Sequence, residues 1–170
     1  MKEVEVKILE VDKDEVIKKL KDLGAKKVFD GEIIAIYFDF EGQKLTKGGK
    51  LLRLRKRGEK VELTFKQMIS REKAKIMEEY EVKLTDFDVI KKILNELGLK
   101  EFRKVIKHRV SYTLNNIHFE LDTFPDIPAF LEIEAPSIEK IREFAHKLGF
   151  SIEDTKPWSV WDVLEYYEKK

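Results

Sequence analysis

The chain has 170 residues, of which 34 are Lys or Arg and 33 are Asp or Glu, so its formal net charge at pH 7 is +1. This balance argues against a dedicated duplex-DNA binder, and the absence of cysteine excludes thiol catalysis, a thiolate metal site and a disulfide-stapled fold. The N-terminus lacks the apolar core of a signal peptide and no apolar run is long enough for a membrane helix. We therefore expect a soluble, cytoplasmic protein with no nucleic-acid or membrane partner, and its many charged residues and few amides are typical of thermophiles.

Three segments of similar pattern, 3–24, 79–98 and 132–149, each pair a Glu-x-Glu strand or its start with one amphipathic helix that closes at Leu-Gly. The strand parts alternate with period 2 and the helical parts follow the 3.6-residue period. The closing glycine is the left-handed residue that commonly ends a helix. Solenoid repeats are more regular and more numerous, so the pattern predicts one pseudo-symmetric domain over 1–170.

Further strand-like runs lie between these units. They are 26–40, 50–57, 60–68, 103–114 and 116–123. The segment 42–49, GQKLTKGG, indicates a turn or mobile loop, and a last amphipathic helix is expected over about 158–168. About eight strands and a few helices predict an α+β protein, with one antiparallel sheet or barrel and the helices outside.

Charged side chains on these strands are sorted by sign. Members of each group are two residues apart, so they leave the same face of their strand. The acidic pairs are Glu3/Glu5, Glu79/Glu81, Glu120/Asp122 and Glu132/Glu134. The basic residues are Lys7, Arg53, Arg55, Arg57, Lys66, Lys83, Lys107 and Arg109.

A solvated outer face explains any single pair, because antiparallel sheets commonly have one wet face. It explains the whole pattern less well, since a wet face gains most from opposite charges placed side by side. If the sheet closes into a barrel with this face inward, its lumen is costly unless a ligand carrying both signs fills it. A metal-bound polyphosphate fits, because carboxylates bind Mg²⁺ or Mn²⁺ and Arg and Lys bind phosphate oxygens.

The motifs, in order, resemble those of the CYTH superfamily, also called triphosphate tunnel metalloenzymes. The opening Glu3-Val-Glu5-Val-Lys7 resembles the ExExK signature of that family. The other matches are Tyr37-Phe38-Asp39, Leu52-Arg53-Leu54-Arg55, Leu63-Thr64-Phe65-Lys66, Lys107-His108-Arg109, Leu121-Asp122 and Phe130-Leu131-Glu132-Ile133-Glu134-Ala135-Pro136. The short layout resembles the class IV adenylyl cyclase-like branch, which also relates to thiamine triphosphatase.

The resemblance implies an eight-stranded antiparallel β tunnel with a charged interior, which binds a divalent metal (Mg²⁺ or Mn²⁺) and a triphosphate. The metal-site candidates that it implies are Glu3, Glu5, Glu81, Glu120, Asp122, Glu132 and Glu134, with Glu3, Glu5 and Glu134 as the catalytic candidates. The phosphate-binding candidates are Lys7, Arg53, Arg55, Lys66, Lys107, Arg109 and Lys156.

Two stretches depart from the family pattern. Ile33–Ile36 stand where many members have a Gln and an Asp, and Ile127-Pro128 where many have Leu-Gly. Both stretches are expected to lie away from the charged rows. They therefore affect the identity of the substrate more than the expectation that phosphate is bound. The candidates are ATP, tripolyphosphate and thiamine triphosphate.

The remaining chemistry-bearing residues carry no assigned role. None of the three histidines is assigned catalysis: His108 is expected to point outward, and His118 could face the lumen although a surface role is favoured. Trp158 and Trp161 are expected to pack within the fold rather than to stack on a base.

Two reactions are compatible with such a cradle. Water attacking the terminal phosphorus gives hydrolysis, and a ribose 3′-hydroxyl attacking the α-phosphorus gives a cyclic nucleotide and pyrophosphate. Both need the same charged lumen and differ in which phosphorus lies beside the metal. A non-catalytic module that binds polyphosphate or nucleotide is the alternative, followed by a structural or partner-binding domain.

Overall fold

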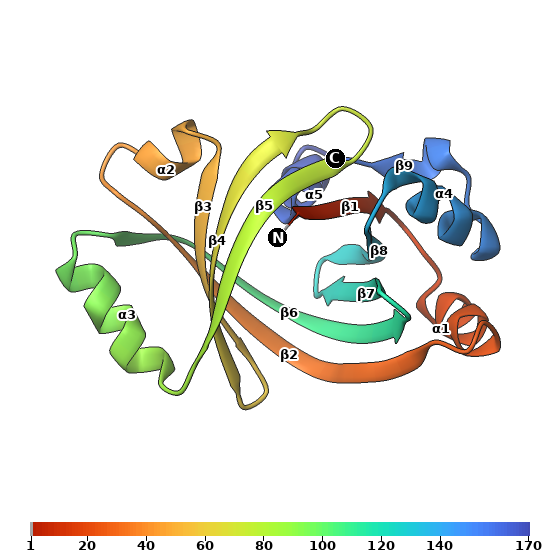
Figure 1. Ribbon diagram of the computed structural model, residues 1–170, viewed down its shortest axis with the longest axis horizontal. Coiled ribbons are helices and arrows are strands. Elements are labelled where there is room, and N and C mark those ends of the chain that lie inside the picture. The colour runs from red at the N-terminus through yellow and green to blue at the C-terminus, as the bar shows by residue number, and fades with distance from the viewer. Residues whose placement is uncertain (1) are drawn as a thin grey trace.

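The computed structural model describes residues 2–170 (Figure 1). In chain order the elements are β1 (Lys2–Ile8), α1 (Lys13–Asp22), β2 (Lys26–Asp39), α2 (Lys44–Lys47), β3 (Lys50–Arg57), β4 (Lys60–Ser70), β5 (Lys75–Leu84), α3 (Phe87–Glu96), β6 (Lys100–Leu114), β7 (Ile117–Phe124), β8 (Ile127–Ala135), α4 (Ile138–Lys147), the 3₁₀ turn η1 (Ile152–Asp154), β9 (Thr155–Lys156) and α5 (Val160–Glu168). None of these helices combines the length and the apolar composition that a bilayer span requires.

The sheet closes on itself. Its strands are hydrogen-bonded in the order β5-β4-β3-β2-β6-β7-β8-β1, and β1 also pairs with β5. Every pairing is antiparallel, so the predicted eight-stranded antiparallel barrel is confirmed. The short β9 pairs with the end of β1, at Lys7 and Ile8, beyond the stretch that β5 covers. Because a closed barrel has almost no free strand edge, its backbone groups are satisfied within the wall.

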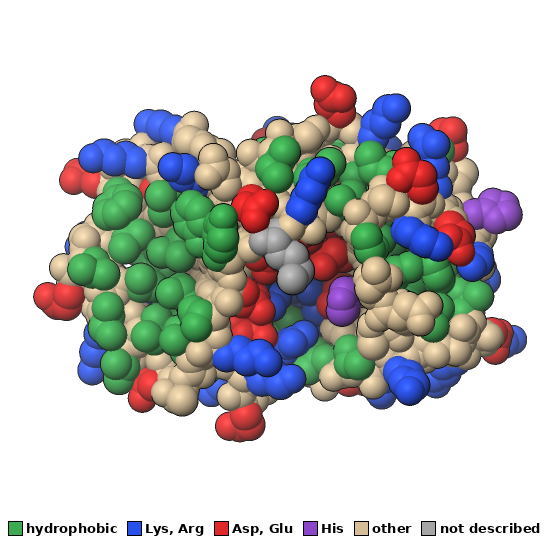
Figure 2. Space-filling view, viewed as in Figure 1, with side chains coloured by type: hydrophobic (Ala, Val, Ile, Leu, Met, Phe, Trp, Pro, Cys, Tyr) green, Lys and Arg blue, Asp and Glu red, His purple; other side chains and the backbone are tan. Residues whose placement is uncertain are grey.

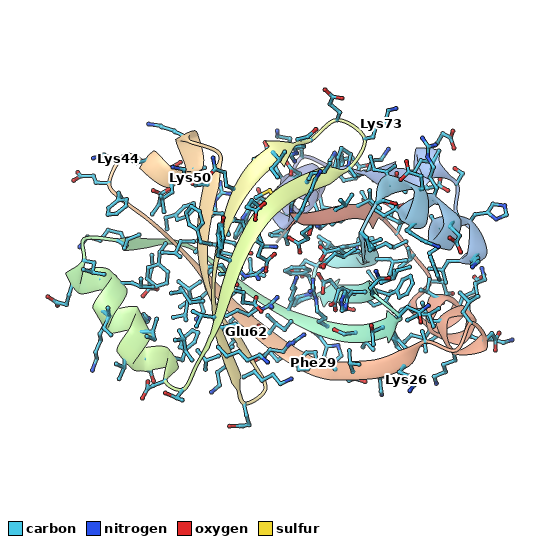
Figure 3. All side chains as sticks on the ribbon, viewed as in Figure 1. Lys26, Phe29, Lys44, Lys50, Glu62 and Lys73 are labelled. Atoms are coloured by element: carbon cyan, nitrogen blue, oxygen red, sulfur yellow. The ribbon has the colours of Figure 1, made fainter. Side chains whose placement is uncertain are left out.

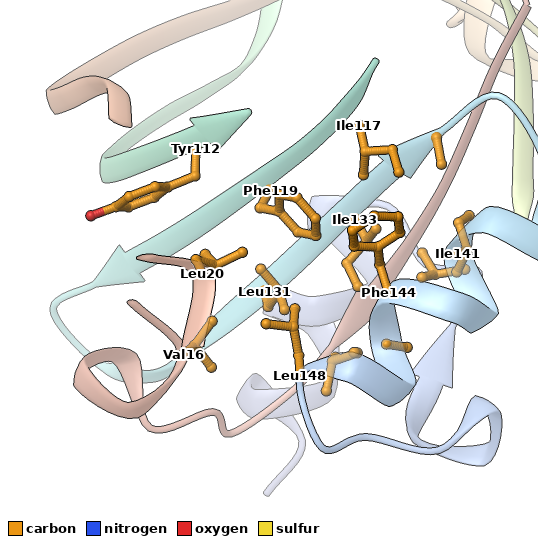
Figure 4. Close-up of a cluster of buried hydrophobic side chains, with 14 of the residues drawn as sticks. Val16, Leu20, Tyr112, Ile117, Phe119, Leu131, Ile133, Ile141, Phe144 and Leu148 are labelled. Atoms are coloured by element: carbon orange, nitrogen blue, oxygen red, sulfur yellow. The ribbon is translucent and has the colours of Figure 1, made fainter. Parts of the chain in front are cut away.

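The apolar face of the barrel points outward, toward the helices. Around α1 and α4, the strand residues Phe119, Leu131 and Ile133 pack against Leu20 and Phe144 (Figure 4). At the other end, α3 covers a second cluster with its inward-facing side. Leu94 of α3 lies there among Ile36, Phe38, Leu54 and Val61 of the strands.

This outward packing fixes where the charged residues go. In β1, Val4, Val6 and Ile8 are buried in the outer core, so the alternating Glu5 and Lys7 have to face the barrel interior. The glycines predicted to end the three repeated helices all have positive φ: +83° at Gly24, +90° at Gly98 and +88° at Gly149. The alternating strands thus give the barrel a polar inner face and an apolar outer face, and the amphipathic helices cover the outer face.

The segment 42–49 differs from the turn or mobile loop expected of it, because it contains the one-turn helix α2. The buried carboxylate of Asp39 holds this turn by accepting hydrogen bonds from the backbone N–H of Leu45 (2.8 Å) and Thr46 (2.9 Å) and from the Thr46 hydroxyl (2.7 Å). A helix this short has no detectable period, and its stabilising residue belongs to the preceding strand. Local sequence therefore gave no sign of it.

Candidate functional site

The barrel encloses a cavity of about 680 Å³, within the size range of small-molecule sites. Figure 2 shows a hollow near the middle of the viewed face, with acidic and basic side chains along it. Residues from all eight barrel strands line the cavity, together with Ser159, Val160 and Trp161 at the start of α5. In Figure 1, α5 lies behind the strands.

Nearly all the predicted site residues meet in this cavity. Those lining it are Glu3, Glu5, Lys7, Arg53, Arg55, Lys66, Glu81, Lys107, Arg109, Glu120, Glu132 and Glu134. Asp122 and Lys156 are not among the lining residues. Charges from remote parts of the chain are thus gathered into one enclosure, although the metal-binding and phosphate-binding roles remain predictions.

Most acids in the cavity face a cation on another strand. The ammonium of Lys66 lies 2.6 Å from a carboxylate oxygen of Glu3, and that of Lys7 lies 2.6 Å from Glu132. Lys7 is almost fully buried, and although burial opposes its charge, Glu132 and Glu5 raise its pKa. These ammonium groups are therefore charged at neutral pH and could exchange a carboxylate for a phosphate oxygen.

Asp122 lies behind the lining and is fully buried. Its carboxylate accepts two hydrogen bonds from the Arg109 guanidinium, at 2.6 and 2.7 Å, and one from Lys107 at 2.6 Å. Burial alone would raise the pKa of Asp122, but Arg109 and Lys107 hold it below its ordinary value. As the residues stand, Asp122 orients two predicted phosphate-binding side chains and has no free oxygen toward the cavity.

Glu3 shares a hydrogen bond with Glu134 and another with Glu79, and all three carboxyls line the cavity. Burial, followed by the charge and the hydrogen bond of Glu3, raises the pKa of Glu134 to about 9. Glu134 therefore holds a proton at neutral pH. This proton lies between two carboxyl groups that would otherwise repel each other. A divalent cation could take the place of the proton and bind both carboxylates.

The donor set fits a hard cation, because Mg²⁺ and Mn²⁺ prefer carboxylate oxygens. In residues 2–170, however, no three acidic or histidine side chains stand close enough to hold a metal. Several carboxylates are engaged with Lys or Arg instead. A metal site here requires Glu134 to lose its proton and at least one carboxylate to leave its cation.

Two charged residues that organise the site were missed from the sequence. Lys75 of β5 lines the cavity and forms an ion pair with Glu5, its register partner across the seam that closes the barrel. Glu62 of β4, labelled in Figure 3, is buried, and it pairs with Arg55, 2.7 Å away, and with Arg57, 3.6 Å away. Each is an even number of residues from a motif residue later on its own strand, Lys75 from Glu79 and Glu62 from Lys66. Alternation along the strand could therefore have placed both side chains on the inner face.

The departure at Ile33–Ile36 lies inside the site, so the expectation that it lies away from the charged rows was wrong. Ile33 and Ala35 line the cavity, and their partners on β3 are Arg57 and Arg55. The reason is parity, because Tyr37 also faces inward and the side chains of a strand alternate. One wall of the charged cavity is consequently apolar.

Trp161 packs as expected, but it does so at the cavity. Its ring meets Tyr37 edge-on at 5.0 Å, and the guanidinium of Arg103 lies 4.6 Å above it. Trp158 packs against Tyr166 outside the lining. His118 lines the cavity while remaining exposed to solvent, so it combines the two positions considered for it.

Comparison with known proteins identifies the family. The model of the CYTH domain matches residues 1–154. The chain belongs to the CYTH family.

Similar proteins match most of the chain. A Methanocaldococcus jannaschii protein provisionally named an adenylate cyclase is 32% identical over 143 residues, which cover 84% of this chain and 81% of that protein. A solved structure from Pyrococcus horikoshii is 30% identical, covers 92% of this chain and 96% of its own, and has a TM-score of 0.78. A Vibrio parahaemolyticus structure, also provisionally named an adenylate cyclase, covers 96% and 97% with a TM-score of 0.86; at 19% identity it shows the fold alone.

Proposed function

We propose that this CYTH protein is a metal-dependent enzyme that binds a triphosphate in its tunnel and catalyses attack on one of its phosphorus atoms. The observation that carries the proposal is the barrel cavity in which carboxylates and Lys or Arg side chains from seven of the eight strands meet. Such an interior is unfavourable when empty of ligand, and it matches a ligand that is both anionic and cation-bound.

Each set of residues has a distinct part in the proposal. Arg53 and Arg55 offer guanidinium forks that position phosphate oxygens, and Lys7, Lys66 and Lys107 offer ammonium groups. Glu3 and Glu134, with Glu5, Glu81, Glu120 or Glu132, would hold the divalent cation. When bound, that cation would neutralise charge that develops on the phosphate oxygens.

The chain's own residues also order the reacting groups. Glu62 and Asp122 hold Arg55 and Arg109 in fixed directions, so the cradle is organised before the ligand arrives. The cavity wall formed by α5 and the strands limits access of bulk water, which strengthens the charge interactions inside.

Hydrolysis and cyclisation are both compatible with this cradle. The provisional name of the Methanocaldococcus jannaschii relative supports cyclisation of ATP. The apolar wall at Ile33 and Ala35 supports an organic substituent on the triphosphate. A binding module without turnover is the remaining alternative.

A substrate screen with product identification tests the proposal. We expect turnover of at least one of ATP, thiamine triphosphate and tripolyphosphate with Mg²⁺ or Mn²⁺, and none after chelation with EDTA. Orthophosphate as the sole new product identifies hydrolysis, and cyclic AMP with pyrophosphate identifies cyclisation. Tight binding of all three compounds without turnover at any temperature up to unfolding would contradict the enzyme and favour the module.

Arg55→Ala is expected to weaken triphosphate binding by about 10- to 100-fold, because a hydrogen bond between charged groups contributes about 1.5–3 kcal/mol. Monophosphate binding should fall less, since a shorter ligand reaches fewer of the cavity cations. Calorimetry with both ligands measures the difference, and Lys56→Ala, an exposed residue of the same strand, is the matched control. Equal losses for the two ligands would place Arg55 outside the cradle.

A further inference from the structure

One side of α3 carries an apolar stripe that the fold leaves uncovered. Val89, Ile93 and Leu97 follow one another at intervals of four residues and are 48%, 47% and 66% exposed. Phe87, Ile90 and Leu94 already serve the core on the inward side of the same helix. The residues of the stripe therefore do not take part in packing α3 against the barrel.

The stripe continues onto the barrel wall. Val82 and Tyr80 of β5 are 52% and 63% exposed, and their register partners on β4 are Leu63 and Phe65. Figure 2 shows a broad hydrophobic area at the left of the molecule, where Figure 1 places α3 beside the strands. A contiguous exposed area of this kind on a soluble protein commonly marks an interaction surface.

The charges beside the stripe are complementary to one another. Lys92 and Glu96 are exposed, and neither forms an ion pair or hydrogen bond within residues 2–170. The Glu-to-Lys pairs of the same spacing on α1, α4 and α5, such as Glu15 with Lys19, are all closed. Lys92 and Glu96 run in the reverse order, Lys before Glu, which pairs less well within a helix.

A second copy of the same helix satisfies both features at once. If two α3 helices lie antiparallel around a two-fold axis beside Ile93, Val89 meets the partner's Leu97 and Ile93 meets the partner's Ile93. The same arrangement brings Lys92 close to the partner's Glu96, and by symmetry Glu96 close to the partner's Lys92. The surface is thus complementary to itself.

We propose that this face, defined by Val89 and Ile93 of α3, by Leu97 at the C-terminal cap of that helix and by Tyr80 and Val82 of β5, is the interface of a homodimer. A stable interface buries about 800 Å² per partner, more than three side chains of one helix supply, so the β5 residues belong to it. The closed barrel offers almost no free strand edge for association, which favours side-chain packing of this kind. The proposal does not depend on the proposed function of the tunnel.

The test is the mass in solution, measured by size-exclusion chromatography with light scattering over a range of concentrations. The wild-type chain is expected to have twice the monomer mass, and Ile93→Lys is expected to be monomeric. Lys92→Glu should raise the dimer dissociation constant by about 10-fold or more, because like charges then face each other across the axis. The double variant Lys92→Glu/Glu96→Lys should restore the dimer, since the exchange keeps the pairing with an identical copy.

Val28→Lys is the matched control. Val28 is 56% exposed and lies on β2 between Lys26 and Phe29 in sequence, and Figure 3 labels these two neighbours on the part of β2 away from α3. It should remain a dimer, and circular dichroism should show every variant folded. A monomeric wild-type chain at all concentrations overturns the proposal and leaves a different protein as the occupant. A dimer that survives Ile93→Lys overturns it as well, because the interface must then lie elsewhere.

Discussion

Replacing Glu134 with Gln is expected to lower metal-dependent turnover by at least about 100-fold, the scale seen when a group that organises a reacting centre is removed. The substitution preserves shape and removes only the ability to become an anion. Glu134 lies against Glu3 in the cavity, and loss of its proton would give a divalent cation a second anionic carboxylate beside Glu3. Steady-state kinetics at saturating Mg²⁺ or Mn²⁺ measures the loss.

The raised pKa of Glu134 adds a signature that a merely structural residue would lack. Because Glu134 holds its proton up to a pKa of about 9, a cation that binds it at neutral pH has to displace that proton. Cation affinity should therefore rise as the pH increases toward 9. Calorimetry in buffers of different ionisation enthalpy should detect a released proton for the wild-type chain and none for Glu134→Gln.

Glu139→Gln serves as the matched control, since Glu139 is an exposed residue of α4 outside the cavity. It should keep wild-type turnover and proton release. If Glu134→Gln behaves like Glu139→Gln in both measurements, the cation site assigned to Glu3 and Glu134 is wrong.

The direction in which each strand side chain faces could be predicted from the sequence with two simple rules. Period-2 alternation assigned Glu3, Glu5 and Lys7 to one face of β1, and the apolar alternate residues required helices on the other. The strand-like runs gave about eight strands, and the CYTH resemblance then supplied closure, which alternation alone leaves open between a sheet and a barrel. Extending the same parity along β2 would have placed Ile33 and Ala35 in the cavity.

The pairing of charges could not be predicted in this way. Whether Glu5 meets Lys75 depends on the register between the first and fifth strands, which are 70 residues apart at this contact. Alternation also does not predict which inward-facing carboxylate lines the cavity and which lies behind the lining, hydrogen-bonded to Arg and Lys side chains. Glu120 and Asp122 have the same parity on β7, yet only Glu120 lines the cavity.

Closure of the cavity by α5 also lay beyond local patterns. The amphipathic run at 158–168 predicted the helix, and its start at Val160 was close to that expectation. Its position depends on remote contacts, among them the ion pair of Arg71, which follows β4, with Asp162. Such contacts join segments that are distant in sequence, so Trp161 could be assigned to packing but not to the cavity.

Arg109→Met is expected to lower the free energy of unfolding by about 3 kcal/mol or more, the scale for leaving a buried charge without its partner. Arg109 and Asp122 are both buried, and the guanidinium holds the carboxylate through two hydrogen bonds. Lys107 remains beside Asp122 in the variant, but one ammonium cannot replace a two-point contact.

A double-mutant cycle separates the pair from the loss of a side chain. Arg109→Met and Asp122→Leu should each destabilise the chain, and the double variant should lose clearly less than the sum, because neither charge is then left alone. Arg71→Met is the control for an exposed pair, its partner being Asp162, and it should cost at most about 1 kcal/mol. Urea unfolding curves give all the values. A cycle without coupling would mean that Asp122 is not held by Arg109 and is available for the metal role that the family resemblance implies.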